Sequence, residues 1–330
     1  MRSVILDSPS LCLGLSGDKN MSLRVGITGA NGFIGNGLIE SNKKRFDIFE
    51  YGREQSSRYS TFRYIDLTDD MDIGFEYIDV FLHFAAYSSF NSRVDLDALN
   101  NVNVSATVNL ARICADFGVK RFIFLSSVKT LGESTSSNEA YRFDSAYNPQ
   151  DPYGESKAEA EKELLKIARE TGMEVTIIRA PLVYGPGVKA NFASLLKLAE
   201  MNLPLPLGSV NNARSMVGIQ NLVDLIVTCI DHPNAGNQIF MASDGHDVST
   251  SELLKEMTRA FGKKPRLLPF PMSLMSFAAR LVGKGAIADR LFGSLRVDIE
   301  HTKKTLDWVP KVTLQEELAR CVEHMKGQVK

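Results

Sequence analysis

The sequence predicts an α/β fold, in which a doubly wound parallel sheet is accompanied by a smaller C-terminal α/β domain. Short apolar strand patterns alternate with helical patterns through the first half, three glycines separate the first strand from the first helix, and the pattern changes after Gly187. Such alternation is typical of a parallel sheet with helices on both faces. The predicted strands cover 23–28, 47–52, 62–65, 79–84, 121–126 and 174–179, and the predicted helices among them cover about 33–43, 96–117 and 153–171.

The glycines follow the first strand directly. Gly29 allows a tight turn, Gly32 lets the backbone approach a pyrophosphate, and Gly35 lets the next helix pack closely on the strand. The N-terminus of that helix then points its free N–H groups at the phosphates. This arrangement predicts a dinucleotide cofactor, NAD or NADP, held by Gly29, Asn31, Gly32, Phe33, Ile34 and Gly35.

Tyr153 and Lys157 stand four residues apart in a predicted helix that begins at Asp151 and Pro152, a favourable cap and first residue. Residues at this spacing share a helix face, so the Lys157 ammonium is expected beside the Tyr153 phenol. Lowering a phenol pKa by about three units takes roughly 4 kcal/mol of preferential stabilisation of the phenolate. A partly desolvated Lys157 and a cationic nicotinamide ring together supply it, which makes Tyr153 a candidate acid–base residue that also touches the cofactor.

The second half of the chain carries helical patterns at about 191–201, 217–231, 249–262 and 312–327. The longest apolar stretch, 267–282, is interrupted by two prolines and Arg280, and we predict a buried loop and helix there. It falls short of the roughly 18–20 residues that a membrane span requires, so no membrane insertion is expected.

The composition is that of an ordinary soluble enzyme, with 330 residues of which 44% are apolar and 23% charged. A formal net charge of −1 gives no indication of a nucleic-acid or acidic-membrane partner. The four cysteines lack metal-ligand spacing, so no metal site is expected. Cys114, Cys229 and Cys321 lie in apolar helical patterns, which favours core thiols in a reducing, cytoplasmic protein.

The N-terminal residues 1–21 are expected to form a disordered extension outside the fold. The short apolar run Val4–Leu6 is followed by Asp7 and Pro9, so a secretory signal is not predicted.

Together, the glycines and the Tyr153/Lys157 pair resemble the extended short-chain dehydrogenase/reductases. The chain is similar to the epimerase/dehydratase branch that acts on nucleotide sugars, and to UDP-hexose 4-epimerases and 4-keto-reductases within it. The resemblance implies a Rossmann-type NAD(P)-binding domain over 22–185 plus about 216–245, and a nucleotide-sugar-binding domain over about 186–215 plus 246–330. It also implies a homodimer formed through the helices at 96–117 and 153–171.

The same resemblance assigns two more catalytic residues. Ser127, aligned by way of Gly132, is expected to hydrogen-bond the reacting hydroxyl or carbonyl, whereas Ser126 is structural. Asn103 matches the asparagine that reaches Lys157 through water.

Asn101 and Asn109 lie in the same predicted helix and are the alternatives to Asn103. An asparagine within a helix is also commonly solvated without any catalytic role.

The choice between NAD and NADP depends on the end of the second strand. Gly52 stands where an NAD enzyme usually has an acidic residue, and Arg53 follows it. A guanidinium suits a 2′-phosphate, so the sequence favours NADP; the alternative is a solvated arginine in the turn. His83 is interpreted as a packed strand residue. By resemblance, Asp66 and Leu67 flank the adenine, and the cofactor also passes Phe84, Ala85 and Ala86.

The resemblance also implies substrate contacts in the second half. Asn191 and Arg214 match residues that hold the diphosphate, and Leu207 lies in a segment that lines the nucleobase. Lys129 stands where many 4-epimerases have threonine, so it faces the sugar, the diphosphate or solvent. The Asp-Glu pair typical of 4,6-dehydratases is not present after Ser127, which argues against dehydration.

The leading hypothesis is therefore a UDP-sugar 4-epimerase acting on a UDP-hexose or UDP-N-acetylhexosamine. The alternative is an NADPH-dependent reductase of a UDP-4-keto-6-deoxy-hexose, which uses the same residues and fits Arg53 better. Either activity would feed polysaccharide or O-antigen sugar biosynthesis. A non-catalytic NAD(P) sensor is disfavoured because such proteins usually lose the Tyr/Lys pair, and a steroid or flavonoid reductase would leave Asn191 and Arg214 without a role.

Overall fold

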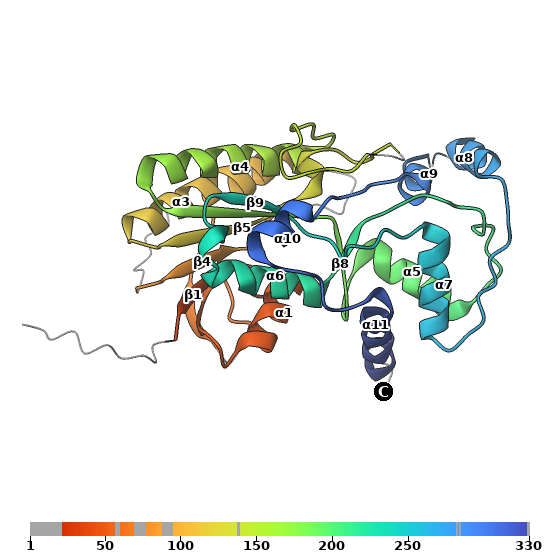
Figure 1. Cartoon of the computed structure of the whole chain (residues 1–330), viewed down its shortest axis with the longest axis horizontal. Helices are drawn as coiled ribbons and strands as arrows, with labels where there is room; N and C mark the ends of the chain where they lie inside the picture. Colours follow the sequence, from red (N-terminus) through yellow and green to blue (C-terminus); the bar gives the residue numbers. More distant parts are fainter. Residues whose placement is uncertain are drawn as a thin grey trace, which may run out of the picture.

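A seven-stranded parallel sheet forms the centre of the computed structural model (Figure 1). The structure describes residues 22–56, 60–68, 77–87, 95–136, 139–281, 283 and 285–328, so the predicted extension at 1–21 lies outside the described residues. In spatial order the strands are β3 (Thr61–Tyr64), β2 (Asp47–Gly52), β1 (Arg24–Thr28), β4 (Val80–His83), β5 (Arg121–Ser127), β6 (Glu174–Ala180) and β9 (Gln238–Met241).

This sheet confirms the predicted fold class and the six strands predicted from the first half. The central strands are buried on both faces, as parallel sheets require, and all four residues of β4 are buried. The seventh strand, β9, was not predicted; it lies far along the chain from its neighbour β6.

Helices cover the two faces of the sheet in separate layers. Helices α3 (Ala106–Asp116) and α4 (Pro152–Thr171) pack together on one face, while α1 (Phe33–Asn42) and α6 (Ile219–Asp231) pack together on the other (Figure 1). Each layer has its own buried apolar cluster against the sheet. Helix α10 (Glu300–Leu306) returns late in the chain to lie beside β9.

The predicted helix at 96–117 is interrupted by a wider turn. It consists of α2 (Leu96–Asn100), a π-helical segment at Asn101–Ser105 and then α3. Such π turns occur within α-helices, frequently at functional sites. Asn103 lies in this segment and is buried.

The C-terminal part is built around a third apolar cluster shared by α5 (Ala190–Met201), α7 (Thr250–Ala260) and α11 (Leu314–Gln328). Two short strands, β7 (Leu182–Tyr184) and β8 (Met216–Gly218), pair in parallel.

The expectation of a buried segment at 267–282 is wrong. Helix α8 (Met272–Leu281) presents large apolar side chains to solvent, and the shorter α9 (Gly285–Phe292) follows it. The sequence predicted burial because the stretch is apolar, but burial requires a neighbouring element.

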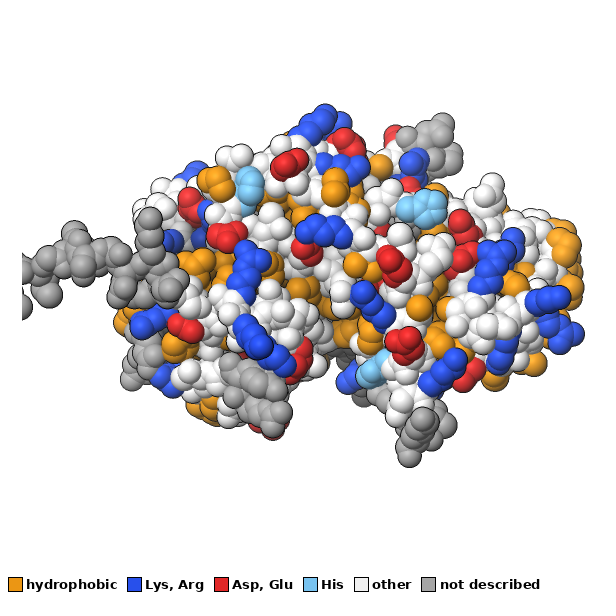
Figure 2. All heavy atoms as spheres, turned by 60° about the horizontal axis from the view of Figure 1, so that its bottom comes forward, with side chains coloured by type: hydrophobic (Ala, Val, Ile, Leu, Met, Phe, Trp, Pro, Cys, Tyr) orange, Lys and Arg blue, Asp and Glu red, His pale blue; other side chains and the backbone are white. Residues whose placement is uncertain are grey.

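The surface drawn in Figure 2 mixes Lys and Arg side chains with Asp and Glu side chains, in line with the small net charge. Within the described part of the chain, none of the helices has the length and apolar character needed to span a bilayer.

Candidate active site

The Tyr153/Lys157 pair lies at the start of α4, as the sequence predicted. Asp151 caps the helix, with its Oδ1 accepting a hydrogen bond from the Gly154 N–H at 2.6 Å, and Pro152 occupies the first turn. This cap fixes the first turn of α4 and therefore the position of Tyr153.

Lys157, a residue of α4, is buried, with 2% of its surface exposed. Its Nζ donates to the main-chain oxygen of Leu125 at 3.0 Å and lies 4.2 Å from the centre of the Phe124 ring. Burial lowers the pKa of Lys157 to about 7, against the opposing charge of Glu161. The ammonium can therefore lose a proton near neutral pH, which an exposed lysine cannot do.

The sequence led us to expect a lowered pKa for the Tyr153 phenol from Lys157 and the nicotinamide ring together, whereas the protein groups raise it. Burial raises the pKa of Tyr153 to about 12, and the negative charge of Asp151 adds to this effect. Burial and Asp151 thus favour the neutral phenol, so phenolate stabilisation by Lys157 and the cationic nicotinamide ring has to overcome both of these effects.

Ser127 ends β5, at the carboxyl edge of the sheet where ligands bind in doubly wound folds. Its Oγ accepts a hydrogen bond from the Lys129 N–H at 3.2 Å and caps the following short helical turn. Ser127 is partly exposed, and its role toward a substrate stays a prediction.

Asn103 links two parts of the site through its amide. Its Oδ1 accepts from the Tyr87 N–H at 2.7 Å, and its Nδ2 donates to the Tyr87 carbonyl and to Ser156 Oγ, both at 3.0 Å. The segment after β4 is thereby tied to α4. Sequence reasoning missed Tyr87 and Ser156, and the predicted water bridge to Lys157 stays a prediction.

Lys129 forms ion pairs with Asp151 and with Glu133, the latter at 2.8 Å. Burial opposes its charge, but the hydrogen bonds to these carboxylates outweigh burial and raise the pKa of Lys129. The ammonium thus holds the short turn after β5 against the N-terminus of α4, and contact with a substrate stays a prediction.

The glycine turn lies so close to the neighbouring backbone that side chains do not fit there. Gly29 has φ +75°, and a Cβ there would lie 2.6 Å from the Ala85 nitrogen; a Cβ on Gly35 would lie 2.3 Å from the Gly29 oxygen. Helix α1 begins at Phe33 without a side-chain cap, which leaves its first N–H groups to a ligand. These features fit a dinucleotide pyrophosphate.

At the end of β2, Gly52 carries no carboxylate and Arg53 is exposed. The acidic residue of this strand, Glu50, is buried and accepts hydrogen bonds from Ser56 and Ser60. It is therefore engaged in holding the loop that follows the strand.

The remaining predicted cofactor residues follow neighbouring strands. Asp66 accepts from the Thr68 N–H at 3.0 Å and from its hydroxyl at 2.7 Å, which lowers the pKa of Asp66. Leu67 follows it, and Asn31 Nδ2 donates to the Glu54 carbonyl at 3.2 Å. Phe84, Ala85 and Ala86 follow β4 beside the glycine turn.

His83 is a packed strand residue. It is fully buried between the hydroxyls of Thr28 and Thr107, at 2.6 and 2.9 Å from its two ring nitrogens. Burial, followed by the charge of Lys157, lowers the pKa of His83 to about 3. The imidazole is therefore neutral at physiological pH.

A buried ion pair that the sequence analysis missed lies one helical turn beyond Lys157. Arg179 on β6 donates to both carboxylate oxygens of Glu161 on α4, with its shortest contact at 2.7 Å. Ser126 and Tyr147 also donate to Glu161, the latter at 2.9 Å. This network holds the catalytic helix on the sheet and confirms a structural position for Ser126.

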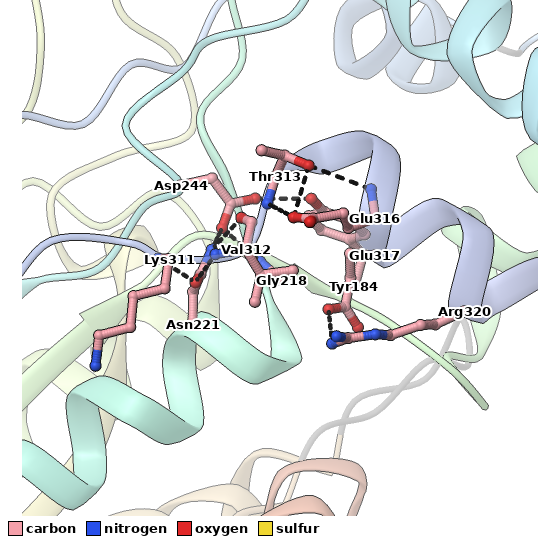
Figure 3. Close-up of polar contacts among 10 residues, drawn as sticks. All are labelled: Tyr184, Gly218, Asn221, Asp244, Lys311, Val312, Thr313, Glu316, Glu317 and Arg320. Carbon is pink, nitrogen blue, oxygen red and sulfur yellow. Dashed lines mark hydrogen bonds and ion pairs between the residues drawn. The ribbon is translucent and has the colours of Figure 1, made fainter.

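A second polar cluster joins the sheet to the C-terminal part (Figure 3). Asp244 accepts from Tyr184 at 2.8 Å, Gly218 at 2.9 Å and Asn221 at 2.7 Å. Glu317 is fully buried nearby, and burial raises the pKa of its carboxyl to about 7.

The predicted substrate residues come from the C-terminal part. Asn191 is exposed in the first turn of α5, and Leu207 is partly buried against α7. Arg214 Nη1 donates to the Gly293 carbonyl at 3.0 Å, and its backbone bridges to Val248 and Leu295. Their binding roles stay predictions.

Comparisons with known proteins identify the family of this chain. The model of the NAD dependent epimerase/dehydratase family matches residues 25–242. A UDP-glucose 4-epimerase of Vibrio cholerae is 44% identical over 322 residues, covering 91% of this chain and 95% of that protein. The N-acetyl-alpha-D-glucosaminyl-diphospho-ditrans,octacis-undecaprenol 4-epimerase of Escherichia coli O157:H7 is 28% identical, covering 77% and 78%.

Solved structures show the same fold. The crystal structure of a UDP-glucose 4-epimerase from Thermotoga maritima with UDP-glucose superposes with a TM-score of 0.76 and 21% identity, over 93% of this chain and all of that one. The family match covers most of the chain, including the glycine turn, Ser127, Tyr153 and Lys157. The chain therefore belongs to the NAD dependent epimerase/dehydratase family.

Proposed function

We propose that this protein is a UDP-sugar 4-epimerase, with Tyr153 taking the proton of the C4 hydroxyl and later returning it. The observation that carries the proposal is the buried Lys157, held one helical turn from Tyr153 at the edge of the sheet where Ser127 stands. The 44% identical Vibrio cholerae UDP-glucose 4-epimerase supports the substrate class. When bound, the nicotinamide supplies the hydride acceptor and donor.

In this proposal each of the protein's own groups has a separate role in the reaction. Ser127 donates a hydrogen bond to the reacting oxygen, and Lys157 stabilises the negative charge that develops on Tyr153. Asn103 keeps the segment after β4 in place beside α4. We further propose that Asn191, Leu207 and Arg214 bind the nucleoside diphosphate, with Lys129 near the sugar, in a homodimer formed through α3 and α4.

The purified protein should interconvert UDP-glucose and UDP-galactose, or their N-acetyl forms, with no added cofactor, as followed by NMR. The reason is that an epimerase regenerates its cofactor in every cycle and retains it. Absence of any epimer, together with NADPH-dependent reduction of a UDP-4-keto-6-deoxy-hexose, would instead identify the alternative reductase, which the exposed Arg53 favours.

We propose that Arg53 gives the site a preference for NADP over NAD. The Arg53→Ala variant should bind NADPH roughly ten- to a hundredfold more weakly, since a charged hydrogen bond contributes about 1.5–3 kcal/mol. Binding of NADH should change little. Fluorescence titration of protein freed of cofactor measures both, and Arg45→Ala, which removes an exposed arginine paired with Asp231, is the control. Equal losses for the two cofactors would contradict the preference.

A further inference from the structure

Large apolar side chains gather on the surface of one region of the C-terminal part. Of the thirteen large hydrophobic residues that are exposed among the described residues, seven lie in two short segments, 201–203 and 268–281. They form what we call the α8 surface, which comprises Met201, Leu203, Leu268, Phe270, Leu274, Phe277 and Leu281.

The helix α8 has its apolar stripe facing outward. Leu274, Phe277 and Leu281 are spaced to fall on one helix face, and they are 57%, 64% and 72% exposed. A surface helix ordinarily turns such a stripe toward the core. Figure 1 shows α8 at the outer end of the C-terminal part, away from the central sheet.

The chain just after Leu203 runs beside the chain that leads into the 268–281 segment. The Leu205 N–H donates to the Arg266 carbonyl at 3.1 Å, and the Leu268 N–H donates to the Leu205 carbonyl at 2.8 Å. The bridge is parallel, with Leu205 opposite Leu267, and the exposed residues Leu268 and Phe270 lie on the chain that leads into α8.

The chain around α8 is strongly basic, although the whole protein has a net charge of −1. Residues 261–288 contain five lysines and arginines and no aspartate or glutamate. Four of these cations, Lys263, Lys264, Arg266 and Arg280, belong to the described residues and are exposed. The apolar stripe of α8 thus lies in a stretch of chain that carries exposed basic residues.

We propose that the α8 surface docks onto an anionic phospholipid bilayer, with α8 lying in the plane of the interface. An interfacial helix of this kind buries its apolar face at the acyl boundary while basic side chains contact the headgroups. A second copy of the chain is the poorer occupant, because a two-fold contact would set the same cations against each other. The proposal does not depend on the sugar chemistry.

The test is flotation of the full-length protein with vesicles. The protein should bind vesicles of equimolar phosphatidylglycerol and phosphatidylethanolamine, bind phosphatidylcholine vesicles much more weakly, and be released by salt, because the attraction to anionic lipid is screened. Absence of binding to the anionic vesicles would overturn the proposal.

Two variants assign the binding to the α8 surface. Leu274→Ser/Phe277→Ser should reduce partitioning at least about tenfold, and Lys263→Ser/Lys264→Ser should reduce it roughly fivefold for each charge removed. The control Tyr64→Ser/Val309→Ser removes apolar residues that are also exposed, at 68% and 56%, but lie elsewhere in the chain. Equal binding by control and α8 variants would overturn the assignment.

Two rival occupants of the α8 surface give different results. If Leu274→Ser/Phe277→Ser changes the mass measured by light scattering but leaves vesicle binding intact, the surface contacts a second copy and the proposal fails. If the same variant raises KM for the nucleotide sugar without affecting vesicles, the surface closes over substrate and the proposal fails. Circular dichroism establishes that each variant remains folded.

Discussion

Replacement of Tyr153 by phenylalanine should lower kcat for epimerisation by about 10²–10⁴-fold, the usual contribution of a positioned acid–base group. The substitution removes one oxygen and keeps the ring, so α4, which is capped by Asp151, should be unchanged. KM for the nucleotide sugar and the content of bound cofactor should remain close to those of the unaltered protein. NMR of the sugar C4 epimers measures kcat and KM, and HPLC of released cofactor measures the cofactor content.

The matched control for this variant is Tyr64→Phe, which removes the same oxygen from a tyrosine that is 68% exposed at the end of β3. It should leave kcat unchanged. If Tyr153→Phe retains kcat within about tenfold of the unaltered protein, another group such as Ser127 moves the proton and the assignment is wrong.

The largest expected effect on stability comes from Arg179→Met. This change removes the guanidinium from Glu161, and the side chains of the pair are only 1% and 0% exposed. An uncompensated buried carboxylate costs about 3–5 kcal/mol of the free energy of unfolding. Urea unfolding followed by circular dichroism measures the loss, and catalytic activity should fall at lower temperature because Glu161 also holds α4, the helix of Tyr153 and Lys157.

Two further variants separate charge from packing. Arg112→Met breaks an exposed pair with Glu170, with side chains 45% and 42% exposed, and should cost only about 0–1 kcal/mol. Glu161→Gln combined with Arg179→Met removes both buried charges and should recover part of the loss. A cost for Arg179→Met no greater than that for Arg112→Met would show that the buried pair does not hold the helix.

The local sequence pattern was sufficient to predict much of the fold. The six strands and the main helices of the first half were predicted because alternating apolar runs and helical spacing are properties of neighbouring residues. The glycine turn was also predictable, since only glycine fits where a Cβ would meet the backbone of Gly29 or Ala85. The strands β7 and β8 have three residues each, too few for such a pattern, and β9 lies far along the chain from its neighbour β6.

The candidate site also has features that local spacing predicted and features that depend on tertiary contacts. Spacing along one helix placed Tyr153 beside Lys157, but it gave no information about the burial that raises the pKa of Tyr153 to about 12 and lowers that of Lys157 to about 7. The partners of Asn103 and the ion pairs of Lys129 join segments that are up to 53 residues apart.

The sequence by itself therefore determined the fold class, the cofactor turn and the Tyr153/Lys157 pair, because each depends on residues close together in the chain. Only the tertiary structure decided that Glu161 meets Arg179 and that α8 turns its apolar stripe outward. The physical reason is that burial and pairing depend on which distant elements pack together. An apolar stretch such as 267–282 has the same sequence pattern whether a neighbouring element covers it or leaves it exposed.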